Sequence, residues 1–312
     1  MTDEVTAFAP ASIGNVAVGF DVLGLALSGV GDRVTVRRID GDDIVVEDVR
    51  GLDGEPHPYL SRAADENTAS IAAKALWDAH GQGGLGLAVY KGVPLQSGMG
   101  SSAASAVAAV VAANALLAEP LPAEALLPFA LEGERYASKG LHADNVAPSL
   151  LGGLVLCPPA LLPRTVTLPG PGGISAVLLH PELQVNTAQA RRLLGKGVTQ
   201  ALWIEQQGYL AGFVAACYSG DAELIGRTLK DVVIEPQRAG NVSCFEAVRS
   251  AAAAAGALGV SLSGSGPSIF ALCPSAKAVN LATAMEQACR AEGIDCQSWV
   301  SDMNAPGARV EP

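Results

Sequence analysis

Residues 94–105 read PLQSGMGSSAAS and lie between a strand-like run at residues 85–90 and an alanine-rich helical run at residues 101–117. A phosphate group needs several converging N–H donors, and Gly98 and Gly100 let the backbone approach it without an intervening side chain. The helix that follows would direct its free N–H groups and its positive dipole end toward the same anion. The order strand, loop, helix therefore predicts a phosphate-binding loop, although a plain strand-to-helix turn with a serine N-cap fits the glycine spacing equally well.

The loop matches neither of the two common nucleotide-binding motifs. It lacks the Gly-Lys-Ser/Thr ending of a Walker A loop, and Ala103 stands where the dinucleotide fingerprint GxGxxG has its third glycine. The function of the loop must therefore be inferred from other segments of the chain.

The composition excludes several classes of protein. The chain has 312 residues, of which 49% are hydrophobic, so it can bury a large core and is long enough for two domains. Its formal net charge of −11 would repel nucleic acid and anionic membranes, so we expect neither as a partner. Its most apolar stretch, residues 103–118, is shorter than the roughly 20 residues that span a bilayer. An anionic ligand must be bound by local donors.

The cysteines and the N-terminus predict a cytoplasmic location. The six cysteines are scattered without a CxxC pair, which is typical of reduced thiols rather than of disulfides or metal ligands. The first residues, MTDEVTAFAPAS, are acidic and contain no apolar run of signal-peptide length.

Apolar periodicity alternates between strand-like and helical runs. Strands are expected at residues 33–39, 43–49 and 85–90, and a strand-turn-strand unit at residues 259–273. Helices are expected at residues 67–80, 101–117, 123–136, 187–194, 200–218, 222–232, 244–255 and 276–292. Because a proline-rich stretch at residues 158–171 interrupts the pattern, we expect an α+β fold of two domains, residues 1–160 and residues 161–312.

Three segments together resemble the motifs of a known enzyme family. The loop PLQSGMGSSAAS resembles the central motif of the GHMP kinase superfamily, which is named for galactokinase, homoserine kinase, mevalonate kinase and phosphomevalonate kinase. The segment APASIGNVAVGFDVLGLAL at residues 9–27 resembles the homoserine kinase version of the first motif, and VSLSGSGPSIFAL at residues 260–272 resembles the third. Met99, Gly14 and Ala17 depart from commoner choices without removing a donor or a charge. The resemblance covers nearly the whole chain.

This resemblance implies a two-domain GHMP kinase fold, with an N-terminal domain like ribosomal protein S5 domain 2 and a ferredoxin-like C-terminal α+β sandwich. It implies that ATP, with Mg²⁺, phosphorylates the side-chain hydroxyl of L-homoserine to O-phospho-L-homoserine in threonine biosynthesis. A homodimer is expected at the family level. Two alternatives stay open: a kinase for another small alcohol such as mevalonate, and a non-catalytic ligand-binding relative.

The resemblance also implies a metal site. Phosphoryl transfer needs a metal ion held by hard oxygen ligands beside the phosphates. Glu134 stands where relatives carry the magnesium carboxylate, and the Ser102 hydroxyl could complete the shell. Without the family, Glu134 is more simply interpreted as a solvated helix residue that pairs with a lysine or an arginine.

Homoserine carries a carboxylate, an ammonium group and a hydroxyl, so its site requires an arginine, an acid and a polar group. Asp21 resembles the ammonium-binding acid of the family, and Arg191 and Arg238 match arginines that clamp the amino-acid carboxylate. Taken singly, each arginine is more often a surface residue. The other residues that the resemblance places at the substrate are Asn15, His142, Asn145 and Gly264, the last in a turn supported by the Ser263 and Ser265 hydroxyls.

The residues expected to take part in catalysis are Asn145, Glu134 and Arg191. Mevalonate kinase uses an aspartate as base in this region, whereas homoserine kinases are thought to rely on transition-state stabilisation and direct proton transfer to the phosphate. The sequence leaves open whether Asp144 acts as a base.

The nucleotide is expected to contact the start of one helix and the central loop. Asn67 matches a position that contacts adenine, and Lys91 is expected along the phosphates. The loop residues expected at the nucleotide are Pro94, Gln96, Ser97, Gly98, Met99, Gly100, Ser101 and Ser102.

Overall fold

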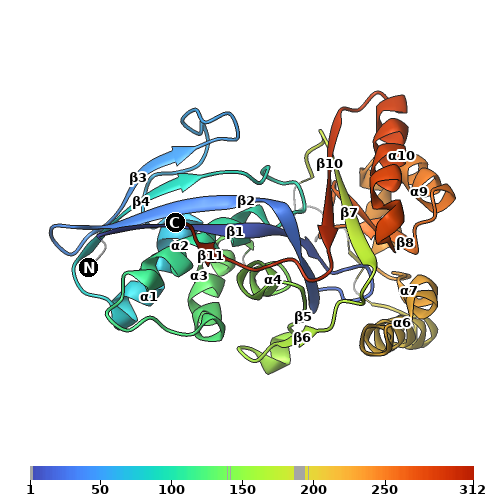
Figure 1. Cartoon of the computed structure of the whole chain (residues 1–312), viewed down its shortest axis with the longest axis horizontal. Helices are drawn as coiled ribbons and strands as arrows, with labels where there is room; N and C mark the ends of the chain where they lie inside the picture. The colour runs from blue at the N-terminus through green and yellow to red at the C-terminus, as the bar shows by residue number, and fades with distance from the viewer. Residues whose placement is uncertain (1–2, 139, 141, 186–193, 196) are drawn as a thin grey trace.

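The computed structural model describes residues 3–138, 140, 142–185, 194–195 and 197–312. Within these residues the chain forms two sheets, each covered by helices (Figure 1). Most of the first sheet comes from the first half of the chain, and the second sheet comes from the second half. The predicted α+β class with two sheet-and-helix halves is confirmed.

The first sheet is built around two long neighbouring strands. Its strands are β1 (Glu4–Gly14), β2 (Leu23–Ile39), β3 (Ile44–Arg50), β4 (Gly84–Tyr90), β5 (Leu154–Leu156), β6 (Val166–Leu168) and β11 (Arg309–Val310). The strand order is β11–β1–β2–β4–β3, and β5 and β6 extend the sheet from β2. β3 and β4 pair in parallel, and the other pairs are antiparallel.

Four helices cover one face of this sheet (Figure 1). They are α1 (Thr68–His80), α2 (Ser101–Ala115), α3 (Leu127–Ser138) and α4 (Val146–Leu151), and a 3₁₀ turn, η1 (Ala123–Leu126), precedes α3. Because α1 connects the parallel strands and α2 follows β4, both helices begin at the edge where β3 and β4 end. The small alanine side chains of α2 are almost all buried and allow close packing on α1 and the sheet. This edge carries the glycine-rich loop.

The second sheet has the strand order β10–β7–β9–β8, and all its pairs are antiparallel. Its strands are β7 (Ile174–Pro181), β8 (Gly259–Leu262), β9 (Ile269–Pro274) and β10 (Cys296–Asp302). The remaining helical segments are η2 (Pro159–Leu161), α6 (Gln200–Ser219), α7 (Ala222–Thr228), α8 (Glu235–Arg238), η3 (Ala239–Asn241), α9 (Phe245–Ala254), η4 (Ser275–Lys277) and α10 (Ala278–Ala291). With α9 before β8 and α10 before β10, this is the ferredoxin-like arrangement.

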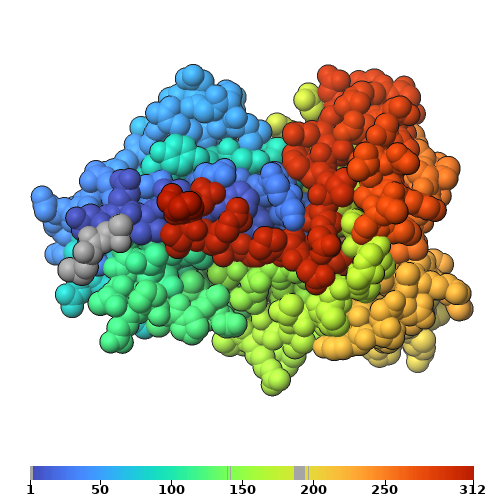
Figure 2. All heavy atoms as spheres, viewed as in Figure 1, coloured from blue at the N-terminus to red at the C-terminus, as the bar shows by residue number. Residues whose placement is uncertain are grey.

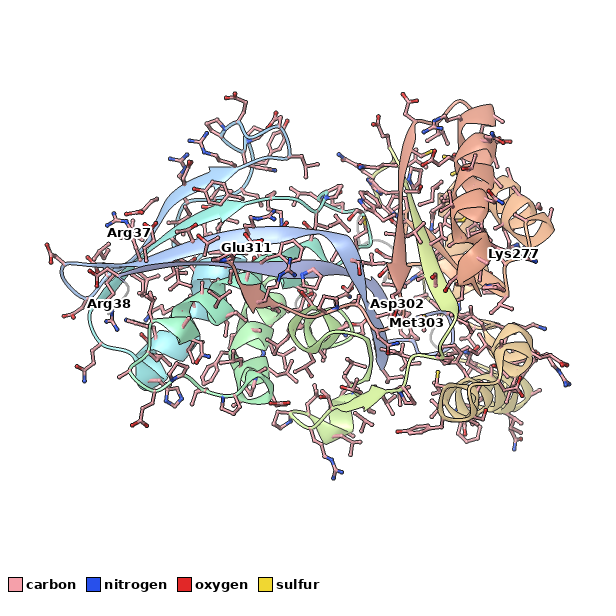
Figure 3. The ribbon with its side chains drawn as sticks, viewed as in Figure 1. Arg37, Arg38, Lys277, Asp302, Met303 and Glu311 are labelled. Carbon is pink, nitrogen blue, oxygen red and sulfur yellow. The ribbon has the colours of Figure 1, made fainter. Side chains whose placement is uncertain are left out.

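A shared core joins the two halves. Ile13 of β1 and Leu25 of β2 are fully buried in one cluster with Phe213 of α6 and Phe270 of β9. After β10 the chain returns to the first half: Met303 is buried at the junction, and the last residues run along the edge of the first sheet, where β11 pairs with β1 (Figures 2 and 3). The halves therefore fold around common apolar side chains.

The expected helices at residues 67–80, 200–218, 244–255 and 276–292 are present within two residues at each end. The helix expected at residues 222–232 already ends at Thr228. The helix expected at residues 187–194 lies almost entirely outside the described residues. Among the described residues, no helix is both long and apolar enough to cross a membrane.

Several strands were not expected from the sequence, notably β1 and β7. Both are buried on both faces for most of their length, so they read as continuous apolar runs without the alternation that marks a half-buried strand. The domain boundary between residues 160 and 161 stays a prediction. Strands β6 and β11, from beyond that boundary, belong to the first sheet.

Replacing Phe270 by alanine tests the shared core. Because the ring is fully buried between the halves, we expect Phe270→Ala to lower the free energy of unfolding by about 3–5 kcal/mol in urea titrations. Tyr59→Ala is the control, since that ring is 87% exposed, and should change it by less than about 0.5 kcal/mol. Equal effects of the two substitutions would contradict the shared core.

Candidate active site

A cavity of about 330 Å³ lies where loops of both halves meet. Its walls are the β1–β2 loop, the β4–α2 loop, α3, the turn before α4, α8 and the β8–β9 turn. Of the residues expected from the sequence, it is lined by Asn15, Asp21, Gln96, Ser97, Gly98, Gly100, Ser101, Ser102, Glu134, His142, Asn145, Arg238 and Gly264. We call this cavity the cleft.

The glycine-rich loop has the backbone shape that a phosphate site requires. Gly98 and Gly100 have positive φ angles of 75° and 68°, and a Cβ atom on Gly98 would collide with the carbonyl oxygen of Ser263. Gly100 is the N-cap residue of α2, so no N-cap side chain competes for the N–H groups of the first turn. The alternative of a turn with a serine N-cap is therefore wrong, and an anion can occupy the helix start.

Glu134 faces the start of α2 from α3. The Ser102 hydroxyl donates a hydrogen bond to its carboxylate at 2.7 Å, and the side chain is buried. Burial raises the pKa of Glu134 to about 7, while hydrogen bonds from Ser102 and Ser138 act in the opposite direction. Glu134 is therefore not a solvated surface acid.

The β1–β2 loop holds its polar side chains in a strained backbone. Asn15, Val16, Ala17 and Asp21 have φ angles of 68°, 45°, 56° and 59°, a region that β-branched valine in particular avoids. The Asn15 side chain accepts a hydrogen bond from the Asp21 N–H at 3.0 Å and donates one to the Gly264 carbonyl at 3.0 Å. These contacts fix Asp21 in the cleft wall.

Asp21, Glu134 and Asp144 make the cleft acidic. Asp144 is buried, and its pKa is raised to about 7, first by burial and then by repulsion from Asp21 and Glu134. His142 places Nδ1 at 3.5 Å from the Asp21 carboxylate. Among the described residues, no group of three or more His, Cys, Asp or Glu side chains is arranged to hold a metal ion. The carboxyl groups can instead receive an ammonium group, or a metal ion that takes further oxygen ligands from a bound phosphate.

Arg238 and Asn145 also line the cleft. Arg238 is buried, donates a hydrogen bond to the Gly264 carbonyl at 3.0 Å and stacks over the Phe20 ring at 5.2 Å. Asn145 precedes α4, and its side-chain oxygen accepts a hydrogen bond from the Ser12 hydroxyl at 2.9 Å. Both side chains are therefore held in the wall of the cleft by contacts with other residues of the protein.

Some expected residues do not line the cleft. The Asn67 side chain accepts a hydrogen bond from the Ala69 N–H and donates one to the Ser61 carbonyl, so it caps α1. The Met99 side chain is fully buried in the shared core, and Pro94 lines a separate cavity. Arg191 lies outside the described residues. Nucleotide contacts of Asn67, Pro94 and Met99 and the substrate contact of Arg191 stay predictions.

Two other expectations change. Lys91 does not face the cleft, because its buried ammonium group pairs with Asp32 and donates a hydrogen bond to the Ser101 carbonyl at 2.8 Å. The Ser263 hydroxyl supports the phosphate loop rather than the substrate side, since it donates to the Gly98 carbonyl at 2.6 Å. The sequence alone leaves the role of Asp144 open, since its position beside Asn145 is the only sign in the sequence that it belongs to the site.

Comparisons with known proteins agree with this geometry. The family model for the N-terminal domain of GHMP kinases matches residues 67–153, and the model for their C-terminal domain matches residues 213–291. The homoserine kinase of Xylella fastidiosa strain 9a5c is 45% identical over 98% of this chain and 94% of its own length. The homoserine kinase of Chloroherpeton thalassium is 41% identical over 98% of this chain and 99% of its own.

A solved structure matches the whole chain. The crystal structure of homoserine kinase from Cytophaga hutchinsonii superposes with a TM-score of 0.94 at 41% identity, covering 100% of this chain and 98% of that one. The two-domain fold expected from the three motifs is thereby confirmed.

The burial of Glu134 predicts a pH-dependent stability. Its native pKa of about 7 lies above its ordinary 4.5, so its contribution to stability is present below pH 4.5 and is lost as the pH rises to 7. We expect Glu134→Gln to raise the free energy of unfolding at pH 8 by on the order of 3 kcal/mol, and to change it little at pH 4. Denaturant titrations without metal ions measure this, with the exposed Glu119→Gln as control. No gain at pH 8 would contradict the raised pKa.

Proposed function

The chain belongs to the GHMP kinase family. We propose that ATP phosphorylates L-homoserine in its cleft. The enzyme is a homoserine kinase and forms O-phospho-L-homoserine. The observation that carries this assignment is the meeting of three separate motifs around one cavity, with backbone N–H groups on one side and paired acidic and basic side chains on the other. Homoserine kinases that match nearly the whole chain support the choice of substrate.

The phosphates of ATP bind at the loop and at the start of α2. The loop and the first turn of α2 offer the backbone N–H groups of Gly98, Gly100, Ser101 and Ser102, whereas that of Met99 donates to the Ser97 hydroxyl, and the dipole of α2 favours a negative charge at this end. These N–H groups bind an anion through their partial positive charges. The site therefore needs no cluster of basic side chains in a chain of net charge −11. Asn67 and Pro94 contribute contacts to the adenosine part in this proposal.

Ser102 and Glu134 fit a magnesium site. Both offer hard oxygen atoms, they lie in contact at 2.7 Å, and they line the cleft beside the phosphate loop. Magnesium is usually held by one or two protein oxygens together with substrate phosphates and water, which is the donor set available here. A bound ion would neutralise charge on the transferring phosphate. Glu134 would then bind in its ionised form.

Homoserine binds on the side of the β1–β2 loop. Asp21, oriented by Asn15 and His142, receives the ammonium group. Arg238 supplies a buried positive charge for the carboxylate, and Arg191 is proposed to share that role. This pairing requires an amino acid, and it disfavours mevalonate, which has a carboxylate but no ammonium group.

We propose that Asp144, which lines the cleft, accepts the proton of the attacking hydroxyl. A general base works best when its pKa lies near the operating pH, and the pKa of Asp144 is raised to about 7. Asn145 is proposed to orient the reacting groups with its amide, which the Ser12 hydroxyl holds in place. The proton would pass from the substrate oxygen to the Asp144 carboxylate as that oxygen attacks the γ-phosphorus.

We propose that the product of the enzyme is consumed in threonine biosynthesis. We also propose that the enzyme is a cytoplasmic homodimer and that neither nucleic acid nor a membrane is a partner. The scattered cysteines and the negative net charge support the location and the excluded partners.

Removing the Glu134 carboxylate tests the metal site. We expect Glu134→Ala to reduce homoserine-dependent ADP formation roughly 100-fold and to raise the magnesium concentration for half-maximal activity. Glu132→Ala on the same helix is the control, since its side chain is 43% exposed. Full activity of the Glu134 variant would overturn the metal site. The assignment of homoserine as substrate would be overturned if the unaltered enzyme formed ADP with mevalonate but not with homoserine.

Removing the Asp144 carboxylate tests the base. We expect Asp144→Asn to lower kcat by roughly 100-fold or more while KM for ATP stays within about twofold. In the unaltered enzyme kcat/KM for homoserine, which reports the ionisation of the free enzyme, should fall as the pH drops below about 7, because Asp144 becomes protonated, and this limb should vanish in the variant. Asp78→Asn, at a side chain that is 61% exposed, is the control. An active variant with an unchanged pH profile would leave the γ-phosphate itself as proton acceptor.

A further inference from the structure

A buried ion pair lies behind the phosphate loop, outside the cleft. Lys91 follows β4, and its ammonium group pairs with the carboxylate of Asp32 on β2. The Asp32 side chain is 0% exposed and that of Lys91 is 3% exposed. Neither residue lines the cleft, and the Lys91 ammonium group is directed toward Asp32, the Ser101 carbonyl and Ser105 rather than into it.

Both ends of the loop are bound to this pair. At the start of the loop, one carboxylate oxygen of Asp32 accepts hydrogen bonds from the N–H groups of Gly92 and Val93 at 2.8 and 3.0 Å. At its end, Lys91 donates to the Ser101 carbonyl at 2.8 Å and to the Ser105 hydroxyl at 2.9 Å.

A third group closes the network. The Ser105 hydroxyl donates to the second oxygen of Asp32 at 2.6 Å, and the Ser101 hydroxyl donates to the Val93 carbonyl at 2.9 Å. The charged groups thus have several partners each, as buried charges require. The first turn of α2 and the entry of the loop are fixed to the same two side chains.

This arrangement determines where the phosphate donors point. The N–H groups of the loop can converge on a phosphate only if the chain enters and leaves at fixed positions, and ligand affinity depends on such preorganisation. We propose that Asp32 and Lys91 are positioning residues for ATP, which act through the backbone of the loop and make no contact with either substrate. This inference rests on the proposed role of the loop in binding ATP.

The test compares KM for the two substrates in a charge-neutral double variant. Single substitutions would leave one buried charge unpaired and lower the stability strongly, so Asp32→Asn combined with Lys91→Met is the main variant. We expect its KM for ATP to rise about tenfold while its KM for homoserine stays within about twofold. Met285→Ala is the control, because Met285 lies on α10 in a separate core of the second half. It should lower Tm and leave both KM values unchanged.

A milder variant keeps the proposal testable if the double variant does not fold. Ser105→Ala removes one hydroxyl of the network, and it should raise KM for ATP about threefold without changing KM for homoserine. Unchanged KM for ATP in every one of these variants that folds, or equal rises for both substrates, would overturn the positioning role. If the unaltered enzyme formed no ADP with homoserine, the proposed function would fail instead.

Discussion

The site depends on a single turn between β8 and β9. The Gly264 carbonyl accepts hydrogen bonds from Asn15 and Arg238, and the Gly264 N–H donates to the Gly14 carbonyl at 3.1 Å. The neighbouring Ser263 hydroxyl donates to the Gly98 carbonyl. One short turn from the second half of the chain therefore holds the β1–β2 loop, the arginine and the phosphate loop together. Its backbone can do so because Gly264 has a positive φ of 59°, which favours glycine.

The cleft combines neutral backbone donors with acidic side chains. Neutral N–H groups lie at the helix start proposed for the phosphates, and the carboxyl groups line the same cleft, where an ammonium group or a metal ion is proposed to bind. Burial raises the pKa of Glu134 to about 7, and burial together with repulsion from Asp21 and Glu134 raises that of Asp144 to about 7. This combination reconciles an anionic chain with an anionic co-substrate.

The sequence predicted those parts of the structure that depend on local pattern. The phosphate loop and helices α1 and α2 follow from glycines and apolar spacing, and the three motifs indicated most residues of the cleft. Side-chain direction was a different matter, because it depends on distant partners. Lys91 turns away from the cleft toward Asp32, which lies 59 positions earlier in the chain. Met99 turns into the core shared with the second sheet. Strands β1 and β7 were missed because burial on both faces removes the alternation.

The core shared by the two halves limits how the enzyme can move. A hinge that swung the halves apart would expose the buried rings of Phe213 and Phe270 to water. The width of the cleft is thus set by the interior of the protein, and each catalytic cycle must proceed without domain opening. The exposed residues Gln96 and Ala137 lie at the rim of the cleft. If ADP occupies the proposed site, the shared core implies that its release depends on small motions of the loops at that rim rather than on a large separation of the halves.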